Sequence, residues 1–344
     1  MKLFDLQPKT RREDLFDRER ELQELHSAIE KGYPLIALLG IRRIGKTSVL
    51  KVLANEVDGV YLDMRGLVKR DDMYMRVADA MSSNIAKMKK LLEGIRGVEV
   101  AGLSLEIRWK GRDSLSLAGL LTEINKKRKR FVVMLDEVQN LRPPLSAEVK
   151  NLIAYSYDNL EHITFIVAGS EIGLLREFLG TENPSSPLYG RGIYEVSVER
   201  FSRGMSEEFL RRGFREEGFE PPEEEIREAV EFFDGIIGWL VLFGRKYIDG
   251  KRRMDDIREA AVELALSELS KLSDREKMVL EAIANGRRSW SDVRKYIGEK
   301  FGIVMPKSTL SRMIDKLEKL SILENYEFLD HVYREAAKRL RVRL

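Results

Sequence analysis

The feature that most constrains this chain is a glycine-bounded loop between an apolar run and a helical segment. Residues 35–39 read Leu-Ile-Ala-Leu-Leu, which is too apolar for a half-exposed strand and suits a buried parallel one. Gly40 to Thr47 match the pattern GxxxxGK[ST], and residues 48–54 continue as a helix. A strand, a glycine-rich loop and a helix in this order predict a site for the phosphates of a nucleoside triphosphate.

The positions of this loop have separate expected roles. Gly40 and Gly45 allow the backbone amides to turn towards phosphate oxygens, and the positive end of the following helix points at the same charge. Lys46 is expected to reach the β and γ phosphates, and Thr47 to place its hydroxyl on Mg²⁺. The two arginines of the loop occupy variable positions of the pattern, where contact with a partner or with solvent is favoured over catalysis. The predicted nucleotide-binding set of the loop is Gly40, Ile41, Arg42, Arg43, Ile44, Gly45, Lys46, Thr47 and Ser48.

A second apolar run, Phe131 to Leu135, is followed by two carboxylates. We expect Asp136 to hold Mg²⁺, through water, and Glu137 to polarise the water that attacks the γ phosphate. The alternative is that an ordinary strand simply ends in an acidic turn without a catalytic role. The upstream phosphate loop makes this alternative less favourable. Gln139 either positions water or is simply solvated.

Two further polar residues are candidates for the catalytic site. Ser170 follows an apolar run at 163–168, and it either senses the γ phosphate or the attacking water, or caps the helix expected at 171–178. Arg191 precedes another strand, at 193–198, and is predicted to stabilise charge on the transferring phosphoryl group. The alternative for Arg191 is an ordinary surface arginine.

The rest of the chain divides by its periodicity. Residues 59–63 read as a strand of the same sheet, and residues 98–109 alternate as a surface hairpin does, with Leu103, Leu105, Ile107 and Trp109 expected to pack. Residues 206–270 have a helical period and are expected to form a lid. The predicted fold is an α/β P-loop core with a parallel five-stranded sheet and helices on both faces, at 1–200, then a helical lid at 201–271 and a winged helix-turn-helix at 272–344.

The last of these predictions depends on three helical segments and a short strand pair. The helices are expected at 273–284, 289–297 and 308–320, and the strand pair at 322–329. From Ser273 onwards the chain has 16 lysines and arginines against 11 acidic residues, although the whole chain carries only +3. The third helix would carry several polar and basic side chains towards a DNA major groove. These residues are Lys307, Ser308, Thr309, Ser311, Arg312 and Lys316. Docking on a protein, or on this chain itself, is the open alternative.

Composition excludes several other classes of site. The chain has no cysteine, so disulfides, thiolate metal sites and cysteine nucleophiles are excluded. Its three histidines, His26, His162 and His331, have no metal-binding spacing. The chain has no run of about 18 apolar residues and begins with a charged rather than signal-like segment, so we expect a cytoplasmic protein with no membrane contact. A charged fraction of 34% is typical of heat-adapted proteins.

Five ordered motifs together resemble the archaeal ATPase family, in the STAND branch of the AAA+ related P-loop ATPases. The motifs lie at residues 16–22, 40–47, 135–139, 168–170 and 187–191. The resemblance implies ATP or ADP as the nucleotide, Mg²⁺, a five-stranded parallel core, a helical lid and frequently a C-terminal winged helix. It also implies that the segment Phe16 to Arg20, with Phe16 and Arg18 as binding residues, lies near the adenine and ribose. The structural alternative for this segment is the start of an amphipathic helix with Asp17 as its cap. The chain departs from the family in the lid, where Ile237 stands in place of a usual proline.

Three functional hypotheses are compatible with these residues. The first is an ATPase that acts as a slow molecular switch, in which ATP closes the lid and reorients the C-terminal domain. The second is a DNA-binding regulator or initiator-like factor whose affinity is set by ATP. The third is a scaffold that holds ADP almost permanently. The residues leave open the oligomeric state, and whether Arg191 works within its own chain or across an interface.

Overall fold

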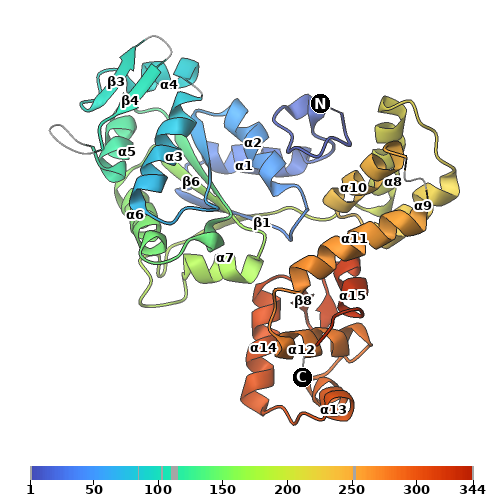
Figure 1. The fold of residues 1–344 in the computed structure, drawn as a ribbon. Helices are drawn as coiled ribbons and strands as arrows, with labels where there is room; N and C mark the ends of the chain where they lie inside the picture. The colour runs from blue at the N-terminus through green and yellow to red at the C-terminus, as the bar shows by residue number, and fades with distance from the viewer. Residues whose placement is uncertain (1, 84, 102–103, 110–114, 251–252, 343–344) are drawn as a thin grey trace.

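The computed structural model describes residues 2–83, 85–101, 104–109, 115–250 and 253–342. Its core is a sheet of five parallel strands in the order β2-β5-β6-β1-β7 (Figure 1). The sheet confirms the predicted fold class. Its strands are β1 (Leu35–Leu39), β2 (Gly59–Asp63), β5 (Phe131–Asp136), β6 (Ile163–Ala168) and β7 (Tyr194–Ser197).

Side chains of alternate strand residues serve two apolar layers, one on each face of the sheet. On β1, Leu35, Ala37 and Leu39 belong to one cluster, and Ile36 and Leu38 belong to the other. Helices α1 (Glu19–Glu30) and α2 (Lys46–Glu56) cover the second cluster. The opposite face is covered by α3 (Arg70–Ser82), α4 (Ile85–Leu92), α5 (Leu117–Lys126), α6 (Leu145–Asn159) and α7 (Ile172–Leu179). Because both faces are covered, β1 is buried throughout, which explains its unbroken apolar sequence.

The predicted hairpin is present as β3 (Val98–Ala101) and β4 (Ser104–Ile107), paired antiparallel. Trp109, just after it, stacks on Tyr74 of α3 with ring centroids 4.7 Å apart. The hairpin therefore packs on the core, as expected; Leu103 lies outside the described residues.

After β7 the chain is helical, apart from one short strand pair. The lid consists of α8 (Arg203–Glu216), α9 (Glu223–Phe233), α10 (Ile237–Ile248) and α11 (Met254–Leu269). The C-terminal unit then follows with α12 (Asp274–Ala284), α13 (Trp290–Phe301), α14 (Lys307–Lys319), β8 (Leu323–Glu324), β9 (Glu327–Phe328) and α15 (His331–Ala337). The three helices and the ribbon match the predicted segments, and α15 is an element that the sequence reasoning missed.

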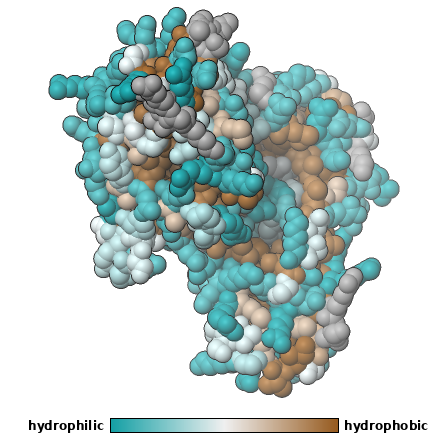
Figure 2. Space-filling model, turned by 60° about the vertical axis from the view of Figure 1, so that its left-hand side comes forward, coloured by the Kyte–Doolittle hydropathy of each residue, from teal (hydrophilic) through white to brown (hydrophobic). Residues whose placement is uncertain are grey.

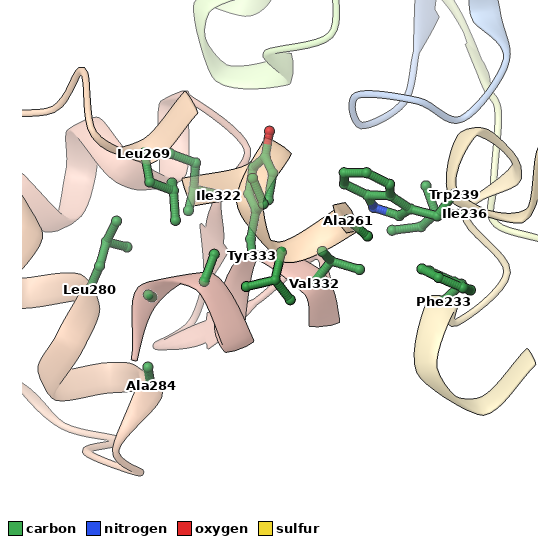
Figure 3. Close-up of a cluster of buried hydrophobic side chains, with 14 of the residues drawn as sticks. Phe233, Ile236, Trp239, Ala261, Leu269, Leu280, Ala284, Ile322, Val332 and Tyr333 are labelled. Atoms are coloured by element: carbon green, nitrogen blue, oxygen red, sulfur yellow. The ribbon is translucent and has the colours of Figure 1, made fainter. Parts of the chain in front are cut away.

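Helix α15 changes how the C-terminal unit attaches to the rest of the molecule. It packs against α11, and one continuous hydrophobic cluster runs from the lid into the C-terminal unit (Figure 3). In that cluster Trp239 and Phe233 of the lid lie beside Val332 and Tyr333 of α15. The lid and the C-terminal helices, which the sequence divides at residue 271, thus share a core. Among the described residues, no helix is long and apolar enough to cross a membrane.

Candidate functional site

The phosphate loop lies at the carboxyl end of β1, directly before α2. Gly45 has φ +102°, a backbone conformation that strains any residue with a Cβ. Lys46 begins α2, and its Nζ donates hydrogen bonds to the carbonyl oxygens of Gly40, at 2.7 Å, and Ile41, at 2.9 Å. Burial lowers the pKa of the Lys46 ammonium to about 8. A buried ammonium whose hydrogen bonds go to main-chain carbonyls is suited to exchange them for anionic phosphate oxygens, which favour its charged form.

Asp136 lies next to this loop, at the end of β5. Its Oδ2 accepts hydrogen bonds from the hydroxyls of Thr47, at 2.7 Å, and Tyr61, at 2.9 Å. Its Oδ1 is buried without a hydrogen-bond partner, and burial raises the pKa of this carboxyl group. An unpartnered carboxylate oxygen beside a hydroxyl is a suitable ligand pair for Mg²⁺, which prefers oxygen. Among the described residues, no group of three or more acidic, histidine or cysteine side chains is placed to hold a metal ion. Asp136 and Thr47 would hold Mg²⁺ together with water and phosphate oxygens.

Glu137 is positioned by two side chains from neighbouring segments. It is half-buried, with φ +57°, and its Oε2 accepts hydrogen bonds from Ser170 Oγ, at 2.9 Å, and from Gln139 Nε2, at 2.5 Å. Helix α7 has Glu171 rather than Ser170 as its N-cap residue, and the Glu171 side chain makes no capping hydrogen bond. Ser170 is therefore not the cap of α7, and its hydroxyl contacts the Glu137 carboxylate; a role in sensing the γ phosphate or the attacking water stays a prediction.

A cavity of about 290 Å³ lies above the phosphate loop, between the core and the lid. One end is polar, with Lys46, Thr47 and Glu137, and the other is largely apolar. Figure 2 shows hydrophobic residues in the hollow between core and lid, on an otherwise mostly hydrophilic surface. Of the predicted nucleotide-binding residues, Phe16, Arg18, Arg42, Arg43, Ile44, Gly45, Lys46, Thr47 and Ser48 line this cavity. Gly40 and Ile41 act at its edge, through the carbonyls that hold Lys46.

Arg18 and Ile237 shape the apolar end of the cavity. Arg18 is buried, donates to the carbonyl of Ile44 at 3.2 Å and lies over the ring of Phe201. Ile237 also lines the cavity, so the residue that departs from the family pattern faces the nucleotide site. The sequence reasoning missed part of the lining: Leu3, Asp5, Leu6, Gln7, Pro8, Lys9, Asp14, Leu15, Phe209 and Val241. None of these carries a motif, because they reach the cavity only through the packing of the lid and the N-terminal segment.

The two arginines of the phosphate loop contact the lid and the C-terminal unit. Arg42 donates to Glu171, at 3.0 Å, and to Glu268 of α11, at 3.2 Å. Arg43 pairs with Glu268 and donates to the hydroxyl of Tyr333 at 3.3 Å. Both arginines thus contact other segments of the same chain.

Arg43 also lies against the lid helix α10. Its guanidinium is 4.1 Å from the ring centroid of Trp239, and its carbonyl accepts from the backbone nitrogen of Gly238 at 2.9 Å. Tyr333 turns its hydroxyl oxygen out of the hydrophobic cluster of Figure 3.

The structure does not bring Arg191 into this cavity. Residue 194 pairs with Ile36, near the start of β1, so Arg191 lies at the edge of the sheet opposite the phosphate loop. The five residues of β1 span about 16 Å at the usual rise of a strand. Arg191 instead pairs with Asp158, at 2.5 Å.

The predicted recognition helix α14 has two differently placed halves. Lys307, Ser308 and Arg312 are exposed in its first half. In its second half Lys316 pairs with Glu276, at 2.6 Å, and Lys319 pairs with Glu177 of α7, at 3.0 Å. The first half is thus open to a partner, while the end of the helix docks on the core.

Comparison with known proteins bears on this site. Residues 15–243 match the family model described as an ATPase domain predominantly from Archaea. The Walker-type ATPase of Pyrococcus abyssi is 37% identical to this chain, with a TM-score of 0.86 and coverage of 98% of this chain and 99% of that one.

Two curated relatives also match. An uncharacterized protein of Methanocaldococcus jannaschii is 24% identical over 301 residues, which are 84% of this chain. The chain spans 58% of the length of that relative. An uncharacterized ATP-binding protein of Pyrococcus abyssi is 26% identical over 252 residues, covering 66% of this chain and 71% of that protein.

Proposed function

Because the chain belongs to the family of ATPase domains found predominantly in Archaea, we propose that it is an ATP-dependent molecular switch. It binds ATP with Mg²⁺, hydrolyses ATP slowly, and uses the nucleotide state to set the position of the lid and the C-terminal unit. One observation carries this proposal: the phosphate loop touches both moving parts directly, through Arg42 and Arg43 on Glu268 and Tyr333.

The side chains around the phosphate end support hydrolysis. Lys46 supplies positive charge to the β and γ phosphates, and Mg²⁺, when bound at Thr47 and Asp136, neutralises developing charge on the phosphates. Glu137 takes a proton from the attacking water, while Ser170 and Gln139 hold its carboxylate in place through the hydrogen bonds already described.

A four-residue segment links this chemistry to the C-terminal unit. Ser170 donates to Glu137, Glu171 accepts from Arg42, and the backbone nitrogen of Ile172 donates to Ser321 Oγ at 2.8 Å. A Cβ on the next residue, Gly173, would lie 2.4 Å from the Cα of Lys319, so the end of α14 rests on this segment. Movement of residues 170–173 upon loss of the γ phosphate would shift α14.

The lid and the C-terminal unit are proposed to move together. They share the hydrophobic cluster of Figure 3, on whose border Ile41 of the phosphate loop packs, whereas Arg42 and Arg43 of that loop contact Glu268 through ion pairs. Separating the shared core would expose buried residues such as Trp239 and Val332, at a cost of about 25 cal/mol for each Å² of apolar surface. Ion pairs and hydrogen bonds with the phosphate loop exchange with water at a much smaller cost.

Purified protein and two variants test the proposal. Glu137→Gln should abolish Mg²⁺-dependent phosphate release while ATP binding persists, and Lys46→Ala should abolish the binding itself. Calorimetry and a phosphate-release assay measure the two effects. Normal hydrolysis by Glu137→Gln would overturn the assignment of the base, and undiminished ATP affinity of Lys46→Ala would overturn the site. Bound ADP in the purified protein with no turnover would instead favour the scaffold hypothesis.

The nucleotide cavity of the same chain lies at the other edge of the sheet from Arg191. In this proposal Arg191 therefore contributes to hydrolysis only across an interface, in the site of a second copy. Arg191→Ala should then lower the ATPase rate at high protein concentration and leave the rate unchanged at high dilution.

The exposed half of α14 favours a second candidate function, in which the C-terminal unit acts as a winged helix on double-stranded DNA. Lys307 and Arg312 would approach the phosphates or bases of the major groove. The binding constant should then fall with salt, with a logarithmic slope of about 0.9 per phosphate contacted, and Lys307→Ala with Arg312→Ala should flatten that slope. A salt-independent interaction, or no interaction with DNA, would leave protein docking as the role of this face.

A further inference from the structure

The N-terminal segment crosses from the lid to the phosphate loop and lines the nucleotide cavity on the way. We propose that residues 2–9, here called the strap, form the base side of the nucleotide site and are held there by Phe4. The inference rests on the proposed nucleotide binding and adds to it: the strap governs affinity for the nucleoside part, whereas Lys46 governs affinity for the phosphates. The family match begins at residue 15, so the strap lies outside it.

One end of the strap is anchored inside the lid. Phe4 is fully buried and packs edge-to-face on Phe214 of α8, with ring centroids 4.9 Å apart. Its ring fills a space that two glycines leave open, because a Cβ on Gly213 or Gly244 would lie about 2.5 Å from ring atoms. Neighbouring contacts are polar: the backbone nitrogen of Leu3 donates to Glu216 at 2.9 Å. Phe4 therefore occupies a socket shaped for an aromatic ring.

The other end of the strap is fastened to the phosphate-loop helix. The backbone nitrogen of Lys9 donates to the hydroxyl of Ser48 at 3.1 Å, and Ser48 directly follows Thr47. The carbonyl of Thr10 accepts from the side chain of Asn55, further along α2, at 2.8 Å. The strap thus connects α8 of the lid to α2 of the core.

Between its two ends the strap lines the cavity. Leu6, Gln7 and Pro8 line it together with Phe16, and Phe209 of α8 belongs to the same lining. Lys46 and Thr47 lie at the polar end of the cavity, so the nucleoside of a nucleotide held there by its phosphates extends towards this wall. A planar base presents apolar faces and a polar edge, which suit Leu6, Pro8 and Phe209 together with the amide of Gln7.

Two consequences follow from this arrangement. Removing the anchor should weaken binding of a nucleotide but not of a bare polyphosphate, because the polyphosphate touches only the phosphate loop. Lid displacement should also withdraw the strap from the base, since Phe4 travels with α8. Nucleotide release and lid opening are then a single event.

The test compares two probes, Mg²⁺-ADP and Mg²⁺-tripolyphosphate, by calorimetry on the full chain. Phe4→Ala should lower the affinity for ADP about tenfold or more and change the affinity for tripolyphosphate by less than about twofold. Phe4→Leu, which keeps an apolar anchor, should recover most of the ADP affinity. Phe178→Ala, which removes a buried ring elsewhere in the core, is the matched control and should leave the ratio of the two affinities unchanged.

Leu6→Ala keeps the test decisive if Phe4→Ala does not fold. Leu6 is 68% exposed, so its truncation leaves the packing of the lid intact. The variant should still lower the affinity for ADP and not the affinity for tripolyphosphate. Equal losses of affinity for ADP and tripolyphosphate, or no loss of affinity for ADP in any strap variant, would overturn the inference. Failure of Lys46→Ala to weaken either probe would instead overturn the nucleotide site itself.

Discussion

The backbone nitrogen of Ile172 donates a 2.8 Å hydrogen bond to the hydroxyl oxygen of Ser321. Ile172 begins the helix that follows Ser170, and Ser321 lies just after α14. Residues 149 positions apart in the sequence therefore join the carboxyl edge of the sheet to the C-terminal unit. The predictions below test this connection and the site that it serves.

Gly173→Ala should undock the end of α14 from the core. The added Cβ would lie 2.4 Å from the Cα of Lys319, a backbone atom that cannot rotate away. Because the chain has no cysteine, dyes can be placed by Ala147→Cys and Lys295→Cys, both at exposed positions, and energy transfer should fall in the Gly173→Ala background. Gly204→Ala is the matched control, since its added Cβ meets no atom within 4 Å. Equal transfer in both glycine variants would contradict the contact.

Ser170→Ala should slow ATP hydrolysis about tenfold and change ATP affinity by less than about twofold. The Ser170 hydroxyl donates to the carboxylate of Glu137, the proposed base, so we expect its loss to affect hydrolysis more than nucleotide binding. Steady-state kinetics and calorimetry separate the two effects, and Ser170→Thr, which keeps the hydroxyl, should retain most of the rate. An unchanged rate in Ser170→Ala would remove Ser170 from the catalytic site.

Glu268→Ala should lower the free energy of unfolding by about 2–3 kcal/mol in nucleotide-free protein. Although burial opposes it, hydrogen bonds from Arg43 and Tyr333 lower the pKa of Glu268, so its carboxylate is charged and paired. Its removal takes this acceptor from Arg43 and the Tyr333 hydroxyl, and leaves Arg42 paired with Glu171 alone.

Asp249→Ala is the matched control for the Glu268 variant. It breaks an exposed pair with Arg245 and should cost less than about 1 kcal/mol. Chemical denaturation of the two variants measures the difference. If Glu268→Ala and Asp249→Ala lowered the free energy of unfolding by the same small amount, the contact between the phosphate loop and the lid would contribute nothing to stability.

ATP binding should take up protons as the pH rises above about 8. The pKa of Lys46 is lowered from 10.5 to about 8 by burial, so the empty site loses the ammonium proton through this range. Phosphate oxygens favour the ammonium form, and the proton must be regained on binding. Calorimetry in two buffers of different ionisation enthalpy should show little uptake near pH 7 and close to one proton near pH 9. No uptake near pH 9 would show that Lys46 keeps its proton in the empty site.

Short-range patterns predicted the elements that carry the site. The phosphate loop, the Asp136-Glu137 pair and four strands of the sheet are each determined within a few residues, by an apolar run and the polar residues that end it, whereas β7 reads Tyr-Glu-Val-Ser and has no such run. The capping box of Ser273 and Glu276 likewise predicted the start of α12. Such signals can be recognised because each element selects its residue types locally.

Helix α15 and the strap could not be found in this way. Helix α15 has seven residues, and its buried face is defined by α11, an element that precedes it by some sixty residues. Phe4 carries no motif, and its socket is made by Gly213 and Gly244 from two different helices. Arg191 is the last residue of a family motif at 187–191, yet the register of β7 against β1 places it at the edge of the sheet away from its own phosphate loop.

The sequence by itself determined the chemistry of this protein: a loop between two glycines with Lys46 and Thr47, two carboxylates after a buried strand, and an α/β core. Only the tertiary structure decided which parts of the molecule touch that loop. Arg42 and Arg43 are unremarkable loop residues until the chain folds and brings Glu268 and Tyr333 against them. Phosphate chemistry needs residue types at fixed local spacing, whereas contacts between distant elements depend on packing that no single segment encodes.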